Sequence, residues 1–168
     1  MIPVALDPST LPLAVAGHGA RAKRRFQALQ MAGASGVRLF LAPNLPSRTD
    51  LAGLRALWIT GLADEISAEL AARARSARVL VNVEDRPALC DFHSVAEVRR
   101  GDLLLTVSTA GASPGLAARI RARLADEFGP EWADRLALLR GRRTVWRRQG
   151  CDVVTRTDAL LRANGWLA

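Results

Sequence analysis

The stretch VAGHGARAKRR, Val15–Arg25, joins an apolar segment to a basic one through two glycines, and its flanks indicate the fold. The apolar run LPLAVAG at residues 11–17 is typical of a buried strand. Residues 20–31 lack glycine and proline, which predicts a helix that Gly33 can end. A strand, a glycine turn and a helix in this order favour a nucleotide-binding unit.

The turn itself has two interpretations. Gly17, Gly19 and Ala22 fit the pattern G-x-G-x-x-G/A, in which the first glycine permits the turn and the second lets the backbone approach a pyrophosphate. The alternative is a turn with a structural role only. His18, inside the turn, is either an exposed filler or a hydrogen-bonding group for a cofactor or substrate.

The second predicted strand, residues 37–42, leaves the form of the cofactor open. A dinucleotide site usually carries an acid at this place to hold the ribose, but the strand ends here in Ala-Pro-Asn. Asn44 could bond a ribose hydroxyl, and Arg48 could meet a 2′-phosphate. The sequence therefore allows either NAD or NADP.

Alternating strands and helices predict a Rossmann-type parallel sheet in the first half of the chain. Residues 56–61 and 77–83 are the next strands, with a helix at 63–75 between them, and the link at 44–55 is too short for a full helix. From Phe92 the pattern changes to a strand pair at 92–98 and 103–108, followed by helices. Ser113 caps the first, Pro114 opens it, and the last two are expected at 131–148 and 155–163.

The predicted fold is therefore α/β with a helical C-terminal part, in three segments. They are residues 1–91, 92–128 and 129–168.

Composition narrows the class of protein. The chain has 168 residues, 49% of them apolar, and a net charge of +8 carried almost wholly by arginine. Either codon bias or an anionic partner, such as nucleic acid or a small molecule with many carboxylates, explains that charge. We expect no membrane span and no signal peptide. Cys90 and Cys151 form neither a zinc pattern nor a disulfide framework, so a cytoplasmic protein is expected.

Two segments carry further candidate chemistry. NVEDRPALCD follows the fourth strand and places Glu84 and Asp85 at the edge where ligands of such sheets bind, with Asp91 a few residues on. Asp85 is a candidate general base, or else belongs to a surface loop and pairs with a nearby arginine. The small residues at 109–113 are a second anion cradle or an ordinary strand-to-helix turn.

Three stretches together resemble one known family. They are VAGHGARAKRR, VLVNVEDRPALCDF and GDLLLTVSTAGASPGLAARIRARL, and they cover most of residues 11–124. The chain is similar in these stretches to the precorrin-2 dehydrogenase and sirohydrochlorin ferrochelatase family, found alone or as the N-terminal module of siroheme synthase. The last two stretches are the more specific, because they are not general features of dinucleotide-binding folds.

The resemblance implies an activity and a set of site residues. The family oxidises precorrin-2 to sirohydrochlorin with NAD⁺, and many members then insert Fe²⁺. The family has a central dimerisation region, so we expect a homodimer formed through Phe92 to Leu124. The sequence shows no dedicated set of metal ligands, and we expect no nucleic-acid partner. The implied catalytic residue is Asp85. The implied cofactor residues are Gly17, His18, Gly19, Ala20, Arg21, Asn44, Leu45, Thr60 and Gly61, and the implied substrate residues are Ser108, Thr109, Gly111 and Ser113.

The chain departs from the family pattern in places that keep rival functions open. His18 replaces the middle glycine of a GGG loop, and Leu62 and Ala63 stand where an acidic turn is usual. The rivals are a member with dehydrogenase activity alone and a degenerate member that only binds tetrapyrrole or nucleotide. A nucleic-acid-binding protein is disfavoured by the loop motifs and by the absence of tyrosine, a residue that could stack on bases.

Overall fold

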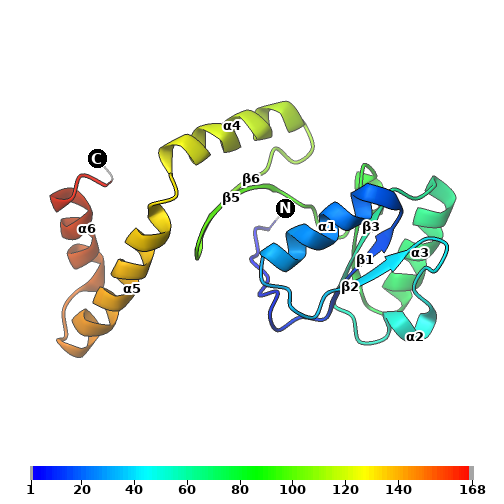
Figure 1. The fold of residues 1–168 in the computed structure, drawn as a ribbon, viewed down its shortest axis with the longest axis horizontal. Coiled ribbons are helices and arrows are strands. Elements are labelled where there is room, and N and C mark those ends of the chain that lie inside the picture. Colours follow the sequence, from blue (N-terminus) through cyan, green and yellow to red (C-terminus); the bar gives the residue numbers. More distant parts are fainter. Residues whose placement is uncertain (1, 167–168) are drawn as a thin grey trace. The chain divides into compact units, whose positions relative to one another are not determined.

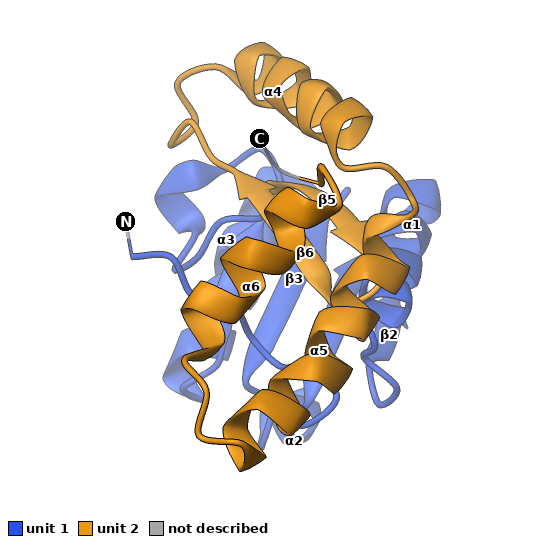
Figure 2. Cartoon of the chain, turned by 90° about the vertical axis from the view of Figure 1, so that its left-hand side faces the viewer, with its two compact units in different colours: residues 1–94 blue, residues 95–168 orange. Residues whose placement is uncertain are grey.

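The computed structural model describes residues 2–166, which form two compact units. Within the described residues, the first unit ends at residue 94 and the second begins at residue 95 (Figure 2). The first unit is built on a four-stranded sheet and the second on a strand pair with three helices.

The sheet of the first unit is entirely parallel. Its strands are β1 (Leu13–Gly17), β2 (Arg38–Leu41), β3 (Ala56–Thr60) and β4 (Leu80–Val83), in the spatial order β2-β1-β3-β4. The chain runs from β1 to β2 on one side and then crosses back to β3 on the other. The carboxyl ends of β1 and β3 thus flank the point where the strand order reverses, which is where sheets of this kind bind ligands.

Helices cover both faces of this sheet (Figure 1). The helix α1 (Gly19–Met31) contributes Ala22 to the cluster that contains Leu13 and Val15. The helix α3 (Asp64–Ser76) packs on the other face, where alternate residues of the same strands point. All residues of β1 and β3 are buried, as the apolar sequence run predicts for a strand covered on both faces.

The link between β2 and β3 is short, as expected, and holds a single helical turn, α2 (Arg48–Leu51). Ser47 and Asp50 form a capping box at its start, with the Ser47 hydroxyl accepting from the Asp50 N–H and the Asp50 carboxylate accepting from the Ser47 N–H. The buried side chain of Leu51 anchors the turn in the core.

Two expected strands begin three or four residues later than the sequence predicts. β4 begins at Leu80 because Ala77 ends α3 and Arg78 adopts a left-handed turn conformation, with φ at 60°. The strand expected from Phe92 begins at Ala96, because the preceding residues are bound to the first unit. The Asn82 amide donates to the Phe92 carbonyl at 2.9 Å, and the Trp58 indole N–H donates to Ser94 at 3.1 Å.

The second unit opens with the antiparallel pair β5 (Ala96–Arg100) and β6 (Leu103–Val107), joined by Gly101 and Asp102. Helix α4 (Pro114–Glu127) packs on this pair, and the Arg100 guanidinium donates to the Phe128 carbonyl at its end. Ser113 accepts from the Leu116 N–H, which confirms the predicted cap.

The last two helices, α5 (Trp132–Arg148) and α6 (Val153–Ala163), pack on each other. Helix α6 starts two residues before the expected position, because the Asp152 carboxylate accepts from the N–H groups of Val154 and Thr155. Hydrogen bonds from Thr155 and Val154 lower the pKa of Asp152 below its usual value.

Candidate functional site

The glycine turn brings β1, β3 and α1 close together. A Cβ placed on Gly17 would lie 2.1 Å from the Thr60 carbonyl oxygen, so only glycine fits there. Ala22 is fully buried beneath the turn. Gly19 has a φ of 60° and nothing within 4 Å of where a Cβ would stand, so its backbone is open to a ligand.

The start of α1 offers free hydrogen-bond donors. His18 is its N-cap residue, yet the imidazole makes no capping bond, and the His18 N–H donates instead to the Thr60 carbonyl at 3.1 Å. The first turn, which includes Ala20 and Arg21, carries no acid. N–H groups at a helix start have no partner within the helix and attract anions. The turn can therefore accept a phosphate, as dinucleotide-binding turns do.

The end of β2 adjoins the same turn. The Ala42 N–H donates to the Gly17 carbonyl at 2.9 Å, which holds the following residues beside the glycines. Asn44 is exposed, whereas the Leu45 side chain packs against the hydrophobic core. Of these two candidate cofactor residues, Asn44 alone presents its side chain to a ligand.

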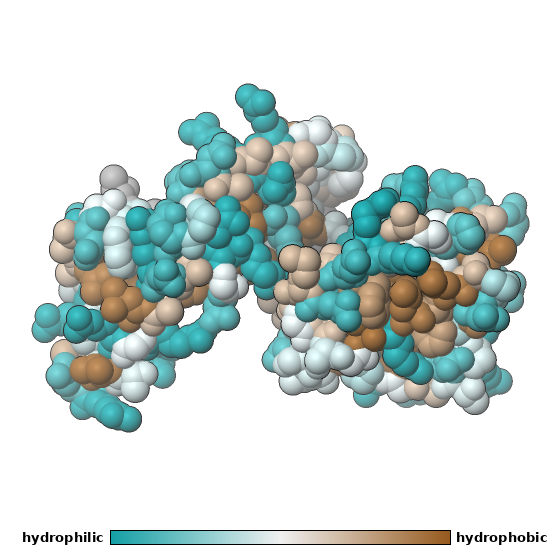
Figure 3. Space-filling view, viewed as in Figure 1, coloured by the Kyte–Doolittle hydropathy of each residue, from teal (hydrophilic) through white to brown (hydrophobic). Residues whose placement is uncertain are grey.

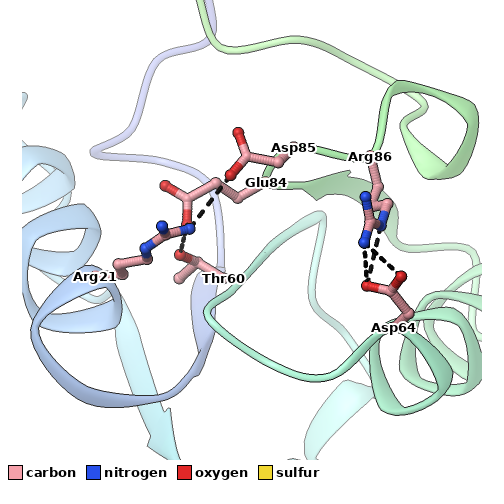
Figure 4. Close-up of polar contacts among 6 residues, drawn as sticks. All are labelled: Arg21, Thr60, Asp64, Glu84, Asp85 and Arg86. Atoms are coloured by element: carbon pink, nitrogen blue, oxygen red, sulfur yellow. Dashed lines mark hydrogen bonds and ion pairs between the residues drawn. The ribbon is translucent and has the colours of Figure 1, made fainter.

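The end of β3 completes the edge of the sheet. Thr60 is buried, and its hydroxyl donates to the Glu84 carboxylate (Figure 4). Gly61 has a φ of 68°, and a Cβ there would lie 3.0 Å from the His18 carbonyl oxygen. Thr60 thus links the glycine turn to Glu84, and Gly61 allows the close approach of the His18 carbonyl, so the engaged Thr60 hydroxyl leaves little side chain here that could touch a ligand directly.

Asp85 lies at the same edge, directly after β4. Its φ of 62° is a left-handed conformation that residues other than glycine adopt at an energetic cost. Its side chain is 75% exposed, and its carboxylate lies 3.2 Å from the Arg21 guanidinium, which is also 3.5 Å from Glu84 (Figure 4). An arginine partner for Asp85 is one of the two alternatives that the sequence allows, and this partner is Arg21, a residue of the glycine turn.

A shallow pocket connects these groups, with Arg21, Gly61, Asp64, Glu84, Asp85 and Arg86 in its lining. Arg86 and Asp64 pair across its far side, and the hydrogen bonds to Asp64 raise the pKa of the Arg86 guanidinium. This pair was missed in the sequence, because 22 residues separate its members and no spacing pattern links them.

Asp91 has a structural role. Its carboxylate accepts from the Val81 N–H at 2.9 Å and from Arg75 Nε at 2.8 Å, so both oxygens are engaged in fixing β4. Cys90 is likewise engaged, accepting from the Val83 N–H at 3.2 Å. The exposed carboxylate after β4 is therefore that of Asp85.

The candidate substrate residues lie in the second unit, in the loop between β6 and α4. The Thr109 hydroxyl donates to the Ser113 carbonyl at 3.0 Å, the Ser113 hydroxyl caps α4, and Ser108 accepts from the Ala110 N–H. Gly111 and Ala110 have positive φ values of 83° and 54°. The hydroxyls thus stabilise a tight loop, of which Ser108 is an exposed part.

Residues 2–166 contain no group of three or more His, Cys, Asp or Glu side chains that could hold a metal ion. None of the helices that the structure describes combines the length and apolar character needed to cross a membrane.

Comparison with known families accounts for most of the chain. Residues 4–96 match the family described as "Putative NAD(P)-binding", and residues 100–127 match the one described as "Sirohaem biosynthesis protein central". The chain belongs to this NAD(P)-binding family. The second match follows the first directly, and the resemblance stated from the sequence is thereby confirmed.

Individual relatives of this NAD(P)-binding chain agree with that assignment. The siroheme synthase of Methylococcus capsulatus is 31% identical over 140 residues, which are 73% of this chain and 30% of that protein. The siroheme biosynthesis protein met8 of Schizosaccharomyces pombe is 37% identical over 65 residues, or 39% of this chain and 25% of that one. The chain thus spans about a third or less of these curated relatives.

The fold has a solved counterpart. A structure titled "SirC, precorrin-2 dehydrogenase" superposes with a TM-score of 0.73 and covers 96% of this chain and 88% of its own, at 20% sequence identity. The predicted fold class, a parallel sheet with flanking helices followed by a helical part, is confirmed.

Proposed function

We propose that this chain catalyses the NAD-dependent oxidation of precorrin-2 to sirohydrochlorin. The observation that carries the proposal is the ion pair of Arg21 and Asp85, which joins the turn of the NAD(P)-binding family to an exposed carboxylate at the same sheet edge. The relatives named siroheme synthase, and the fold shared with a precorrin-2 dehydrogenase, support the choice of substrate.

A dinucleotide fits the residues at this edge. Gly19 exposes its backbone, Gly17 leaves no side chain in the way, and the first turn of α1 is free of acids that would repel a phosphate. The bound nicotinamide would accept a hydride from the substrate. The remaining proton leaves the substrate carbon for the Asp85 carboxylate, which releases it to water, so that electrons and protons balance. Arg21 holds that carboxylate beside the turn.

We assign substrate binding to the loop of the second unit that contains Ser108, Thr109, Gly111 and Ser113. An arginine-rich surface would attract the carboxylate arms of a tetrapyrrole. The three segments 1–91, 92–128 and 129–168 are proposed as the cofactor, dimerisation and helical parts of a cytoplasmic homodimer. Insertion of Fe²⁺ into the product is a further step of the same proposal, with Asp85 as the group that takes up displaced protons.

The test is an anaerobic reaction of the pure chain with precorrin-2 and NAD⁺, followed by NADH fluorescence and the sirohydrochlorin absorbance. We expect both signals with the natural chain. The variant Asp85→Asn should lose roughly 10²- to 10⁴-fold in rate, the usual contribution of a general base. The control Asp126→Asn removes an exposed acid on α4 and should change nothing.

Three results would contradict the proposal in different ways. Full activity of Asp85→Asn would remove Asp85 from the reaction. Binding of precorrin-2 without any turnover would favour a tetrapyrrole carrier. If no siroheme spectrum appears when Fe²⁺ is added after the first step, the chain is a dehydrogenase without ferrochelatase activity.

A further inference from the structure

The side chain of Glu84 makes contacts that the proposed reaction does not use. Its backbone N–H donates to the Ile59 carbonyl at 2.9 Å, which fixes the residue beside the end of β3. Its side chain is 32% exposed, and its carboxylate accepts a hydrogen bond from the buried Thr60 hydroxyl. The side chain of Asp85, the next residue, is 75% exposed and is bound to Arg21 alone. Glu84 is therefore the anchored carboxylate of the two, and Asp85 is the free one.

Both carboxylates face the same nitrogen of Arg21 (Figure 4). The Nη1 atom of this guanidinium lies 3.2 Å from an Asp85 oxygen and 3.5 Å from Glu84 Oε2. That Glu84 oxygen is also the one that accepts from the Thr60 hydroxyl. A row of polar contacts thus runs from a buried hydroxyl on β3, through Glu84 and Arg21, to the exposed carboxylate of Asp85.

Arg21 stands where its charge is not favoured by the helix. It belongs to the first turn of α1, and the free N–H groups already make this end of the helix positive. Asp85 loses its negative charge whenever it takes up a proton in the proposed reaction. Asp64, the other acid in the pocket lining, is bound to Arg86. Glu84 is then the carboxylate that remains beside the Arg21 guanidinium.

We propose that Glu84 is a positioning residue, which keeps Arg21 beside Asp85 while Asp85 gains and releases its proton. This inference rests on the proposed function. Glu84 acts through Arg21 and touches neither substrate nor cofactor. The variant Glu84→Gln can still accept from the Thr60 hydroxyl but carries no charge. It should lower kcat about fivefold, the upper size for a partly exposed ion pair, and leave both KM values unchanged.

The test measures kcat and KM in the anaerobic reaction of the full chain with precorrin-2 and NAD⁺. Arg21→Gln should lower kcat at least as much as Glu84→Gln, and the double variant should lower it no further, because the two residues act as a unit. Thr60→Val keeps the branched shape and removes the hydroxyl, so it should lower kcat by a smaller factor. The matched control Glu69→Gln removes an acid 3.9 Å from Arg73 on α3 and should change neither constant.

The outcomes separate this inference from the proposed function. Full kcat in Glu84→Gln, with the natural chain active, overturns the inference and leaves the proposed reaction standing. An equal loss of kcat in the natural and the Arg21→Gln chains means that Glu84 acts independently of Arg21, which also overturns it.

Three further results would also count against the inference. A raised KM with unchanged kcat would make Glu84 a binding residue instead. If circular dichroism shows that Glu84→Gln does not fold, full kcat in Thr60→Val overturns the inference in its place. If the natural chain binds NADH and precorrin-2 without turnover, the proposed function fails and the inference fails with it.

Discussion

The two units of the chain stabilise their strands in different ways. In the first, β1 and β3 are buried along their whole length, between clusters that face α1 and α3. In the second, the buried apolar side chains among the described residues are Val98 and Trp132 only. Hydrophobic atoms lie at the surface over α5 and α6 (Figure 3). A unit with its own core can hold strained turns for chemistry, whereas the other unit leaves apolar area for another surface to cover.

The largest effect is expected when a side chain is added to the glycine turn of the first unit. Gly19→Val should abolish dinucleotide binding, at least a hundredfold, because the side chain occupies the space beside the turn. The matched Gly53→Val has the same kind of backbone, with φ at 83° and no neighbour within 4 Å of its Cβ. Both variants should lose about 1–2 kcal/mol from left-handed strain, as measured in urea. Equal cofactor affinity in the two variants would mean that the turn is not the cofactor site.

A smaller effect is expected when one leucine in the core of each unit is truncated and the losses in the free energy of unfolding are compared. Leu57 on β3 is fully buried, so Leu57→Ala should reduce the free energy of unfolding by about 2–5 kcal/mol. Leu105 on β6 is half-buried, and Leu105→Ala should cost less than half as much. Chemical denaturation followed by circular dichroism measures both. Equal losses would contradict the difference between the units.

Variants on the apolar face of α4 test whether a second copy of the chain covers the second unit. Leu116 and Ile120 are 52% and 39% exposed on one side of this helix. In the proposed homodimer they would be buried, so the double variant Leu116→Ser, Ile120→Ser should shift the sedimentation profile from dimer to monomer. The control Arg119→Ser lies on the same helix and should leave the profile unchanged. A natural chain that sediments as a monomer at all concentrations would refute the dimer.

The smallest effect concerns the start of α6. Because the pKa of Asp152 is lowered in the folded chain, its contribution to stability is present above the unfolded value of about 3.9 and is lost as the pH falls through the folded value. Asp152→Ala should therefore melt earlier than the natural chain at pH 7, with a difference that narrows toward pH 2. A gap that stays constant with pH would exclude the cap as its cause.

Local sequence predicts well where helices and strands lie, but it predicts poorly which residues far apart in the chain come into contact. The buried run ending at Gly17 and the cap at Ser113 follow from residues next to each other, and both are found in the structure. The late start of β5 depends on contacts of Phe92 and Ser94 with distant side chains. The Arg21–Asp85 pair spans 64 residues and depends on which strands adjoin, which no local pattern encodes.

The left-handed backbone of Asp85 has a consequence for how this position evolves among related chains. Glycine adopts this conformation without steric cost. A lineage that no longer needed the carboxylate would remove the backbone strain by exchanging the aspartate for glycine, so loss of the aspartate would be favoured. An aspartate that persists at this position in a set of related chains is thus a record of selection for chemistry, and its replacement by glycine marks the branches where that selection ended.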